Sequence, residues 1–178
     1  DNIALSFLSV LECQDLNWHS FQLYHYVEKD LALPKNYLSL CYNSKTEVIA
    51  LIIDYFNRQM IVNSQASSLS SLNTGLKITK LLQSRFSTMS NFKKAVKKLF
   101  EFLSFPGNTS IAIKSMWNTC DLIWHHAGDQ STDYNYYSKR LILMSIYLPS
   151  LLFFLQDNSD NSKETMEFIE KKISKKKN

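Results

Sequence analysis

Glycine and proline are scarce in this sequence, since three of each occur among 178 residues. In average proteins these two residue types together make up about 12% of the chain. The tight turns of β-sandwiches and β-barrels depend on them, so their scarcity favours a helical chain. An apolar content of 45% is enough to build a hydrophobic core. We therefore predict an all-α protein.

Apolar residues at helical spacing predict about nine helices. The first four are predicted at 3–13, from Asn17 or Ser20 to about Lys29, at 35–41 and at 46–60. After a loop rich in Ser and Asn at 61–75, five more are predicted at 76–88, at 91–104, at 110–127, from the STD run (131–133) to about Gln156, and at 162–173. Three short helices before a long one are typical of a helix-turn-helix head. We predict such a head with its connecting helix at 1–60 and a larger helical region at 61–178.

Local signals predict several helix ends. Pro34 suits the first turn of the third helix, because proline is well placed there. Ser44 followed by Glu47 three residues later predicts a capping box at the start of the fourth helix. Gly128 stands where a glycine best closes the helix before it.

The net charge of +4 invites a nucleic-acid or membrane interpretation, but the charge is unevenly placed. Residues 61–100 contain seven basic residues and no acidic one, whereas residues 1–44 contain five acidic residues and two basic ones. A DNA-binding head must present cations to phosphates. The acidic head therefore argues against nucleic acid as a partner.

No motif in the sequence points to catalysis, a cofactor or a metal. The three cysteines form no CxxC pair, and there is no GxSxG, GxGxxG or P-loop sequence. Asp121 and His125 are four residues apart on one predicted helix face, but a zinc or di-iron site needs three or four ligands. A histidine at the surface of a helix end is the simpler interpretation. We expect a protein that is not an enzyme.

Two features of the C-terminal half are unusual. The stretch 141–155 is almost entirely apolar but is shorter than the roughly 20 residues that a membrane span needs, so we expect a core helix or a dimer interface. Trp117 and Trp124 lie seven residues apart on one helix, and Tyr136 with Tyr137 begins the next one. Core packing explains most such aromatics, while exposed ones suit a partner surface.

The stretch 116–159 resembles the signature of the coenzyme Q accessory lipid-binding proteins, the ninth Coq protein family. The segment FLSFPGN at 102–108 is also similar to that family's sequences. The matching positions of the main signature are Asp121, Ile123, Trp124, Ala127, Gly128, Asp129, Ser131, Thr132, Asp133, Asn135, Tyr137, Lys139 and Arg140.

This resemblance implies a TetR-regulator-like all-helical fold, a homodimer and loss of DNA binding. It implies a non-enzymatic protein of ubiquinone biosynthesis that binds isoprenoid quinone lipids and supports the di-iron demethoxyubiquinone hydroxylase. A TetR-type DNA-binding repressor is the alternative from another functional class, and steeply salt-dependent DNA binding would identify it.

The resemblance also assigns candidate residues. The partner-binding patch falls on Ile123, Trp124, His126, Asp133, Tyr136 and Tyr137. His126 departs from the family, which can carry larger apolar residues there. An apolar tunnel for the lipid tail would be lined by Leu143, Met144, Tyr147 and Leu151, with a fully packed core as the alternative.

The C-terminal sequence KKISKKKN suggests weak peripheral contact with an anionic membrane, with help from Lys93–Lys98. The chain ends before the membrane-docking helix of mitochondrial family members. We therefore expect a shorter, bacterial-type protein in the cytoplasm and at the inner membrane, with the matrix side of the mitochondrial inner membrane as the alternative. Asp1 suggests a trimmed N-terminus.

Overall fold

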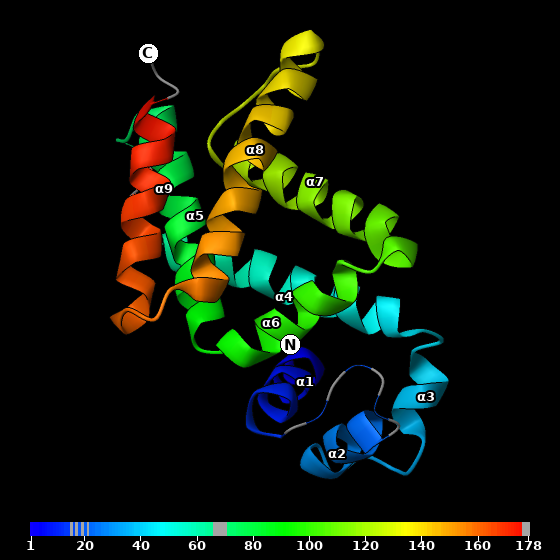
Figure 1. Ribbon diagram of the computed structural model, residues 1–178. Helices are drawn as coiled ribbons and strands as arrows, with labels where there is room; N and C mark the ends of the chain where they lie inside the picture. The colour runs from blue at the N-terminus through cyan, green and yellow to red at the C-terminus, as the bar shows by residue number, and fades with distance from the viewer. Residues whose placement is uncertain (15, 17, 19, 21, 66–70, 176–178) are drawn as a thin grey trace. The chain divides into compact units, whose positions relative to one another are not determined.

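The computed structural model describes residues 1–175 apart from 15, 17, 19, 21 and 66–70 (Figure 1). Over this part of the chain it contains nine α-helices and no β-strand, which confirms the all-α prediction. The helices are α1 (Asn2–Cys13), α2 (Gln22–Asp30), α3 (Tyr37–Cys41), α4 (Lys45–Gln65), α5 (Thr74–Ser90), α6 (Lys93–Leu103), α7 (Thr109–His126), α8 (Tyr134–Gln156) and α9 (Lys163–Lys175).

The helices group into two compact units. The first unit comprises 1–55 and 92–112, and the second comprises 56–91 and 113–178. Residues 1–55 of the predicted head thus form one unit with a later segment that contains α6, whereas residues 56–60 belong to the second unit. Two of the boundaries lie within helices, because α4 and α7 each extend from one unit into the other, and the third lies between α5 and α6.

In the first unit, α1 packs against both α2 and α6. Phe7 and Leu11 of α1 are fully buried, and the ring of Trp18 lies 6.1 Å from that of Phe102. Polar contacts fix the two helices as well. The Glu12 carboxylate accepts a hydrogen bond from the Ala95 amide at the start of α6, and the Lys98 ammonium donates to the Leu11 carbonyl at the end of α1.

The predicted third helix is shorter than expected. Asn36 adopts a left-handed φ of 65°, so the helix begins at Tyr37 rather than at Lys35. The buried Glu28 carboxylate accepts hydrogen bonds from the amides of Asn36 and Leu38, which satisfies donors that a helix start leaves without partners. Lys35 therefore lies before the helix, and α3 carries no cationic residue.

Other helix ends agree more closely with the sequence. The Glu47 amide donates to the Ser44 hydroxyl, as the capping box predicts, although the Glu47 carboxylate accepts from Asn43 instead of Ser44. Ser20 accepts the Gln22 amide at the start of α2, while the alternative cap, Asn17, lies outside the described residues. The fourth helix runs to Gln65, past the predicted end at Met60. Ser64 fits within this extension because its hydroxyl donates to the Ile61 carbonyl.

In the second unit, α9 packs against α5 and α8 (Figure 1). Phe86 of α5 lies 5.4 Å from Phe154 of α8, and both rings are fully buried. The turn between α8 and α9 is held by Asp157, whose carboxylate accepts hydrogen bonds from Ser159 and Thr165. Burial alone would raise the pKa of Asp157, but these hydrogen bonds outweigh it and lower the pKa to about 2.

Among the described helices, α8 alone is long and apolar enough to cross a membrane, with a mean hydropathy of 1.4 over its most apolar window. This test considers only length and composition. Leu143, Ile146 and Phe154 of α8 are buried within the second unit, and Arg140 near its start is buried in an ion pair. One side of α8 therefore belongs to the core, which is one of the two interpretations that the sequence left open, whereas Leu141, Leu148 and Leu152 on α8 are exposed.

Candidate functional site

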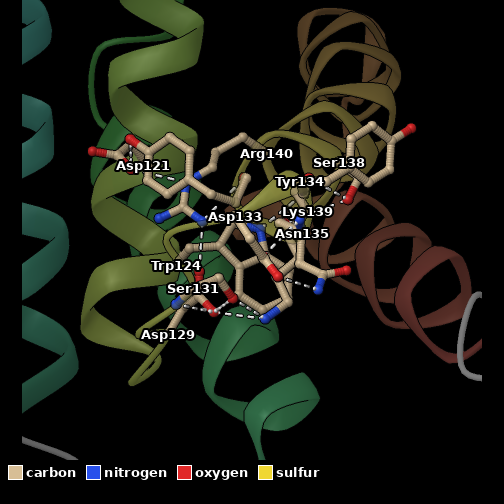
Figure 2. A network of polar contacts seen from close by, with 11 residues as sticks. Asp121, Trp124, Asp129, Ser131, Asp133, Tyr134, Asn135, Ser138, Lys139 and Arg140 are labelled. Carbon is tan, nitrogen blue, oxygen red and sulfur yellow. Dashed lines mark hydrogen bonds and ion pairs between the residues drawn. The ribbon is translucent and has the colours of Figure 1, made fainter.

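The end of α7 is closed by a glycine, as predicted, and this closure places the next residue. Gly128 has a φ of 93°, which L side chains rarely adopt. Its amide donates to the His125 carbonyl and the Asp129 amide donates to the Trp124 carbonyl, which is the Schellman arrangement. The backbone therefore reverses at Gly128, and the carboxylate of Asp129 lies beside the first turns of α8 (Figure 2).

Asp129 is the centre of a buried ionic network. Its side chain is 3% exposed and forms ion pairs with Arg140 at 2.5 Å and Lys139 at 2.7 Å. The Ser131 hydroxyl donates to the same carboxylate oxygen as Lys139. Burial alone would raise the pKa of Asp129, but the hydrogen bonds from Lys139, Ser131 and Arg140 hold it well below its usual range. Asp129 is thus a permanent negative charge that fixes the α7–α8 loop to α8.

Arg140 connects this loop to the body of α7. Its Nε donates to Asp121 of α7 at 2.9 Å, while its Nη1 donates to Asp129. The guanidinium also lies 3.7 Å from the centre of the Tyr136 ring, and the Tyr136 hydroxyl donates to Asp121 at 2.9 Å. One buried cation therefore holds the loop, α7 and the first turn of α8 in a single arrangement.

The start of α8 is capped by Asp133, whose carboxylate accepts the Asn135 amide at 3.0 Å. This confirms that the STD run begins the helix. Beyond the cap, the aromatic residues gather. The Trp117 ring lies 6.4 Å from Tyr136 and 6.2 Å from Tyr137, and the two tyrosine rings are 5.2 Å apart. We call Trp117, Tyr136 and Tyr137 the aromatic cluster.

The six residues that the resemblance assigned to a partner patch differ in exposure. Tyr137 is 58% exposed and Asp133 is also exposed, whereas Tyr136 and His126 are half-buried. Trp124 is half-buried too, and its indole N–H donates to the Lys139 carbonyl at 2.9 Å. Ile123 is fully buried, so it packs beneath the surface and is not itself available to a partner.

The four residues predicted to line a lipid site all lie on α8. Leu143 and Tyr147 are buried inside the second unit, and Met144 and Leu151 are half-buried. The Tyr147 ring packs 5.8 Å from Phe86. Tyr147 also has a polar role that the sequence did not indicate, because its hydroxyl accepts a hydrogen bond from the buried Arg85.

Asp121 and His125, the two possible metal ligands on one face of α7, have other contacts in the structure. Asp121 is engaged by Arg140 and Tyr136, and the ring of His125 lies 5.5 Å from that of His126. Burial, and the neighbouring His125, lower the pKa of His126. In the part of the chain that the structure describes, there is no group of three His, Cys, Asp or Glu residues that could hold a metal ion.

The basic residues of the stretch 77–98 differ in exposure and in their contacts. Arg85 is buried, and Lys98 donates to carbonyls at the end of α1. The stretch also spans the unit boundary, since α5 belongs to the second unit and α6 to the first. Lys94 and Lys97 on α6, and Lys171 and Lys172 on α9, are exposed.

Sequence reasoning missed the residues that fix this site. Asp129, Lys139 and Arg140 were matched only as members of a signature, and Trp117 was noted without a role. The available signal was a charge pattern. Asp129 directly follows the glycine that ends α7, and the adjacent cations Lys139 and Arg140 lie in the second turn of the next helix. Such a spacing does not reveal that the acid and Arg140 are buried together.

Comparison with known proteins gives a family match over this region. Residues 109–178 match the COQ9 family model. They include α7, α8, α9 and the loop at 127–133 with the adjoining ends of α7 and α8, which we call the α7–α8 junction. The ubiquinone biosynthesis protein COQ9 of Bos taurus, named as mitochondrial, is 38% identical over 77 residues, which are 43% of this chain and 24% of that protein. The mitochondrial COQ9 of Homo sapiens is 34% identical over the same share of each chain.

A longer match is found with the probable ubiquinone biosynthesis protein coq9, mitochondrial, of Dictyostelium discoideum. It is 31% identical over 111 residues, which are 62% of this chain and 36% of that protein. The aligned segments therefore span well under half of the length of these relatives.

Among solved structures, a TetR transcriptional regulator from Nitrosomonas europaea ATCC 19718 is similar to this chain with a TM-score of 0.79. The match covers 98% of this chain and 95% of the regulator at 18% sequence identity. This similarity confirms the predicted TetR-like fold.

Proposed function

Because residues 109–178 match the COQ9 family model, we propose that this chain is a COQ9-family protein that acts in ubiquinone biosynthesis as a non-enzymatic accessory protein. It binds isoprenoid quinone intermediates and supports the di-iron demethoxyubiquinone hydroxylase. The observation that supports this proposal most strongly is the family match, which covers the entire α7–α8 junction. The relatives that match this chain are named as ubiquinone biosynthesis proteins.

The proposed partner surface is the aromatic cluster together with Asp133. Tyr137 supplies a large exposed ring, and aromatic residues are frequent among the side chains that dominate binding energy. The network of Asp129 and Arg140 holds the first turn of α8 in place before any partner arrives (Figure 2). Such preorganisation lowers the entropy lost on association. These features favour a docking surface over a purely structural set of aromatics.

The proposed lipid site uses the buried face of α8. Each CH₂ group removed from water contributes about 0.8 kcal/mol, so an isoprenoid tail gains most where apolar side chains surround it. The four proposed lining residues belong to one helix: Leu143 and Tyr147 are buried, and Met144 and Leu151 are half-buried. A tail that enters from the half-buried side, at Met144 and Leu151, would reach the buried residues by displacing neighbouring side chains.

The outer face of α8 suits a second copy of the chain. Leu141, Leu148 and Leu152 are 57%, 38% and 42% exposed and recur at helical spacing. We assign this stripe to the homodimer contact. Light scattering after size-exclusion chromatography should give a dimer for the wild type and a monomer for Leu141→Glu with Leu148→Glu. A monomeric wild type would contradict the assignment.

We propose that the protein is mitochondrial, because the relatives are named as mitochondrial, and that it acts on the matrix side of the inner membrane. Those names give no support to the bacterial cytoplasm. Peripheral contact would be electrostatic, since Ile169 and Ile173 on the apolar face of α9 are buried in the second unit while Lys171 and Lys172 are exposed.

A pull-down with the di-iron hydroxylase tests the proposal. Tyr137→Ala should reduce capture at least tenfold, because a central aromatic contact contributes about 2 kcal/mol or more. Tyr26→Ala is the matched control, since Tyr26 is an exposed tyrosine of the first unit and should leave capture unchanged. Trp124→Ala is less informative because it also removes the hydrogen bond to Lys139. Failure of the folded wild type to bind the hydroxylase would refute the proposal.

A further inference from the structure

The interior of the second unit contains a polar cluster centred on Arg85 of α5. Arg85 is 3% exposed. Its Nη1 donates to the Asn57 side-chain oxygen at 2.6 Å, and its Nε donates to the Tyr147 hydroxyl at 3.0 Å. The same oxygen of Asn57 accepts the Thr119 hydroxyl at 3.1 Å. Polar side chains from α4, α5, α7 and α8 thus meet at one buried point.

The charge of Arg85 is not balanced by any carboxylate in the described part of the chain, since its hydrogen-bond acceptors are a neutral amide and a neutral phenol. The rings of Phe56 and Tyr147 lie 6.0 and 5.7 Å from the guanidinium and stabilise it only partly. Cys120 supplies no negative charge, because burial raises the pKa of its thiol to about 12 despite the opposing charge of Arg85. A guanidinium stays protonated, so burying it costs free energy unless an acceptor compensates.

We propose that Arg85 anchors the head group of the internal ligand. Its guanidinium binds an acceptor oxygen, either a quinone carbonyl or a carboxylate, while the attached apolar chain packs against α8. This assignment rests on the proposed lipid-binding function and adds the residue that selects the ligand's polar end. The acceptor oxygen replaces the Tyr147 hydroxyl, which is a neutral acceptor and therefore binds the guanidinium Nε more weakly than an ionised or strongly polarised oxygen does.

The position of Tyr147 connects this anchor to the apolar site. Its hydroxyl bonds to Arg85, and its ring lies against Phe86 in the same interior. Leu143 is one helical turn before it on α8 and is also buried. A ligand with its oxygen at Arg85 would therefore extend its chain directly along the residues proposed to bind the tail.

Three ligands with ten-carbon chains test the anchor by displacement of Nile red, a neutral apolar dye, from the full chain. Decylubiquinone carries quinone carbonyls, decanoate carries a carboxylate, and decane carries no oxygen. Arg85→Met retains an unbranched apolar side chain but removes the charge and its donors. Lys80→Met is the control, because it makes the same change in charge at a less buried site on the same helix.

We expect Arg85→Met to weaken the binding of the preferred oxygen-bearing ligand at least tenfold and to leave the binding of decane unchanged. The control Lys80→Met should change the binding of none of the three ligands. Decanoate or decylubiquinone as the sensitive ligand would identify the carboxylate or the quinone as the head group. Thermal unfolding of the empty Arg85→Met protein should occur at or above the wild-type temperature, because an uncompensated charge has been removed.

Three results would overturn the anchor. Equal loss of all three ligands together with a lower unfolding temperature would assign Arg85 a structural role. Unchanged affinity for both oxygen-bearing ligands would remove the anchor while leaving lipid binding in place. Failure of every ligand to displace the dye from the wild type would instead refute the lipid-binding function, and the anchor with it.

Discussion

Replacing Asp129 by asparagine should destabilise the second unit by about 2–4 kcal/mol. The substitution keeps the size of the side chain but removes its charge. Asparagine can still accept hydrogen bonds from Ser131 and Lys139 through one oxygen. Its amide nitrogen then faces the Arg140 Nη1 donor, which loses this acceptor and keeps only the Tyr136 carbonyl at 3.2 Å.

The magnitude follows from the burial of each partner. A hydrogen bond to a charged group contributes about 1.5–3 kcal/mol, and Arg140 and Asp129 are both 3% exposed. The ion pair with Lys139 adds at most about 1 kcal/mol, since that side chain is 36% exposed. The loss stays below the roughly 3–5 kcal/mol of a fully broken buried pair because Arg140 retains Asp121.

Urea unfolding measures this cost if the signal comes from the second unit alone. In a Trp18→Phe background the remaining tryptophans, Trp117 and Trp124, both lie in that unit. The background should be well tolerated, because the buried Trp18 indole nitrogen has no hydrogen-bond partner. Asp121→Asn is the matched control and should cost at most about 1 kcal/mol, since Asp121 is 39% exposed.

The effect of pH gives an independent check. The folded pKa of Asp129 is lowered, so its contribution to stability is present above the unfolded pKa of about 3.9 and decreases as the pH falls toward the folded value. The difference between wild type and Asp129→Asn should therefore be constant from pH 6 to 8 and smaller by about 1 kcal/mol at pH 3. A cost below about 0.5 kcal/mol at pH 7, or one that does not change at pH 3, would refute a buried ionic network.

Further predictions concern the helix closure, the thiols and the membrane. Gly128→Ala should lower the free energy of unfolding, measured in urea, by about 1 kcal/mol. The cost comes from the positive φ alone, because an added Cβ meets no atom within 4 Å. An unchanged stability would contradict this. Iodoacetamide at pH 8 should modify the exposed Cys13 and Cys41 in the folded protein. It should leave Cys120 unmodified, because that thiol is buried and has a pKa of about 12. Rapid labelling of Cys120 in mass spectrometry would disprove its burial. Lys171→Glu with Lys172→Glu should abolish flotation with anionic liposomes, whereas undiminished flotation would exclude α9 as the contact.

Much of the fold could be predicted from the sequence because its signals are local. Apolar spacing predicts helices wherever one face is buried, and end signals such as Gly128 and Asp133 depend on residues only a few positions away. The α4 extension was missed since Ser64 can satisfy its hydroxyl within a helix as well as in a loop. The delayed start of α3 was missed because it depends on Glu28, eight residues before Asn36.

The site could be predicted only in outline. The signature indicated the right segment, but not that Asp129 and Arg140 meet or that Ile123 is buried, because those facts come from the packing of α7 against the α8 segment. Arg85 was counted with the surface cations of its stretch. No local pattern distinguishes a buried arginine from a solvated one when its partners, Asn57 and Tyr147, lie 28 and 62 residues away.

Hydrogen–deuterium exchange of the full chain with and without the di-iron hydroxylase tests the central claim most directly. We expect added protection in the peptides that cover Trp117 and the start of α8 through Tyr137, and none in α1 to α3 of the first unit. The Tyr137→Ala variant should lose this protection while exchanging like the wild type on its own. No protection anywhere in the wild type, or protection confined to the first unit, would contradict a partner surface at the α7–α8 junction.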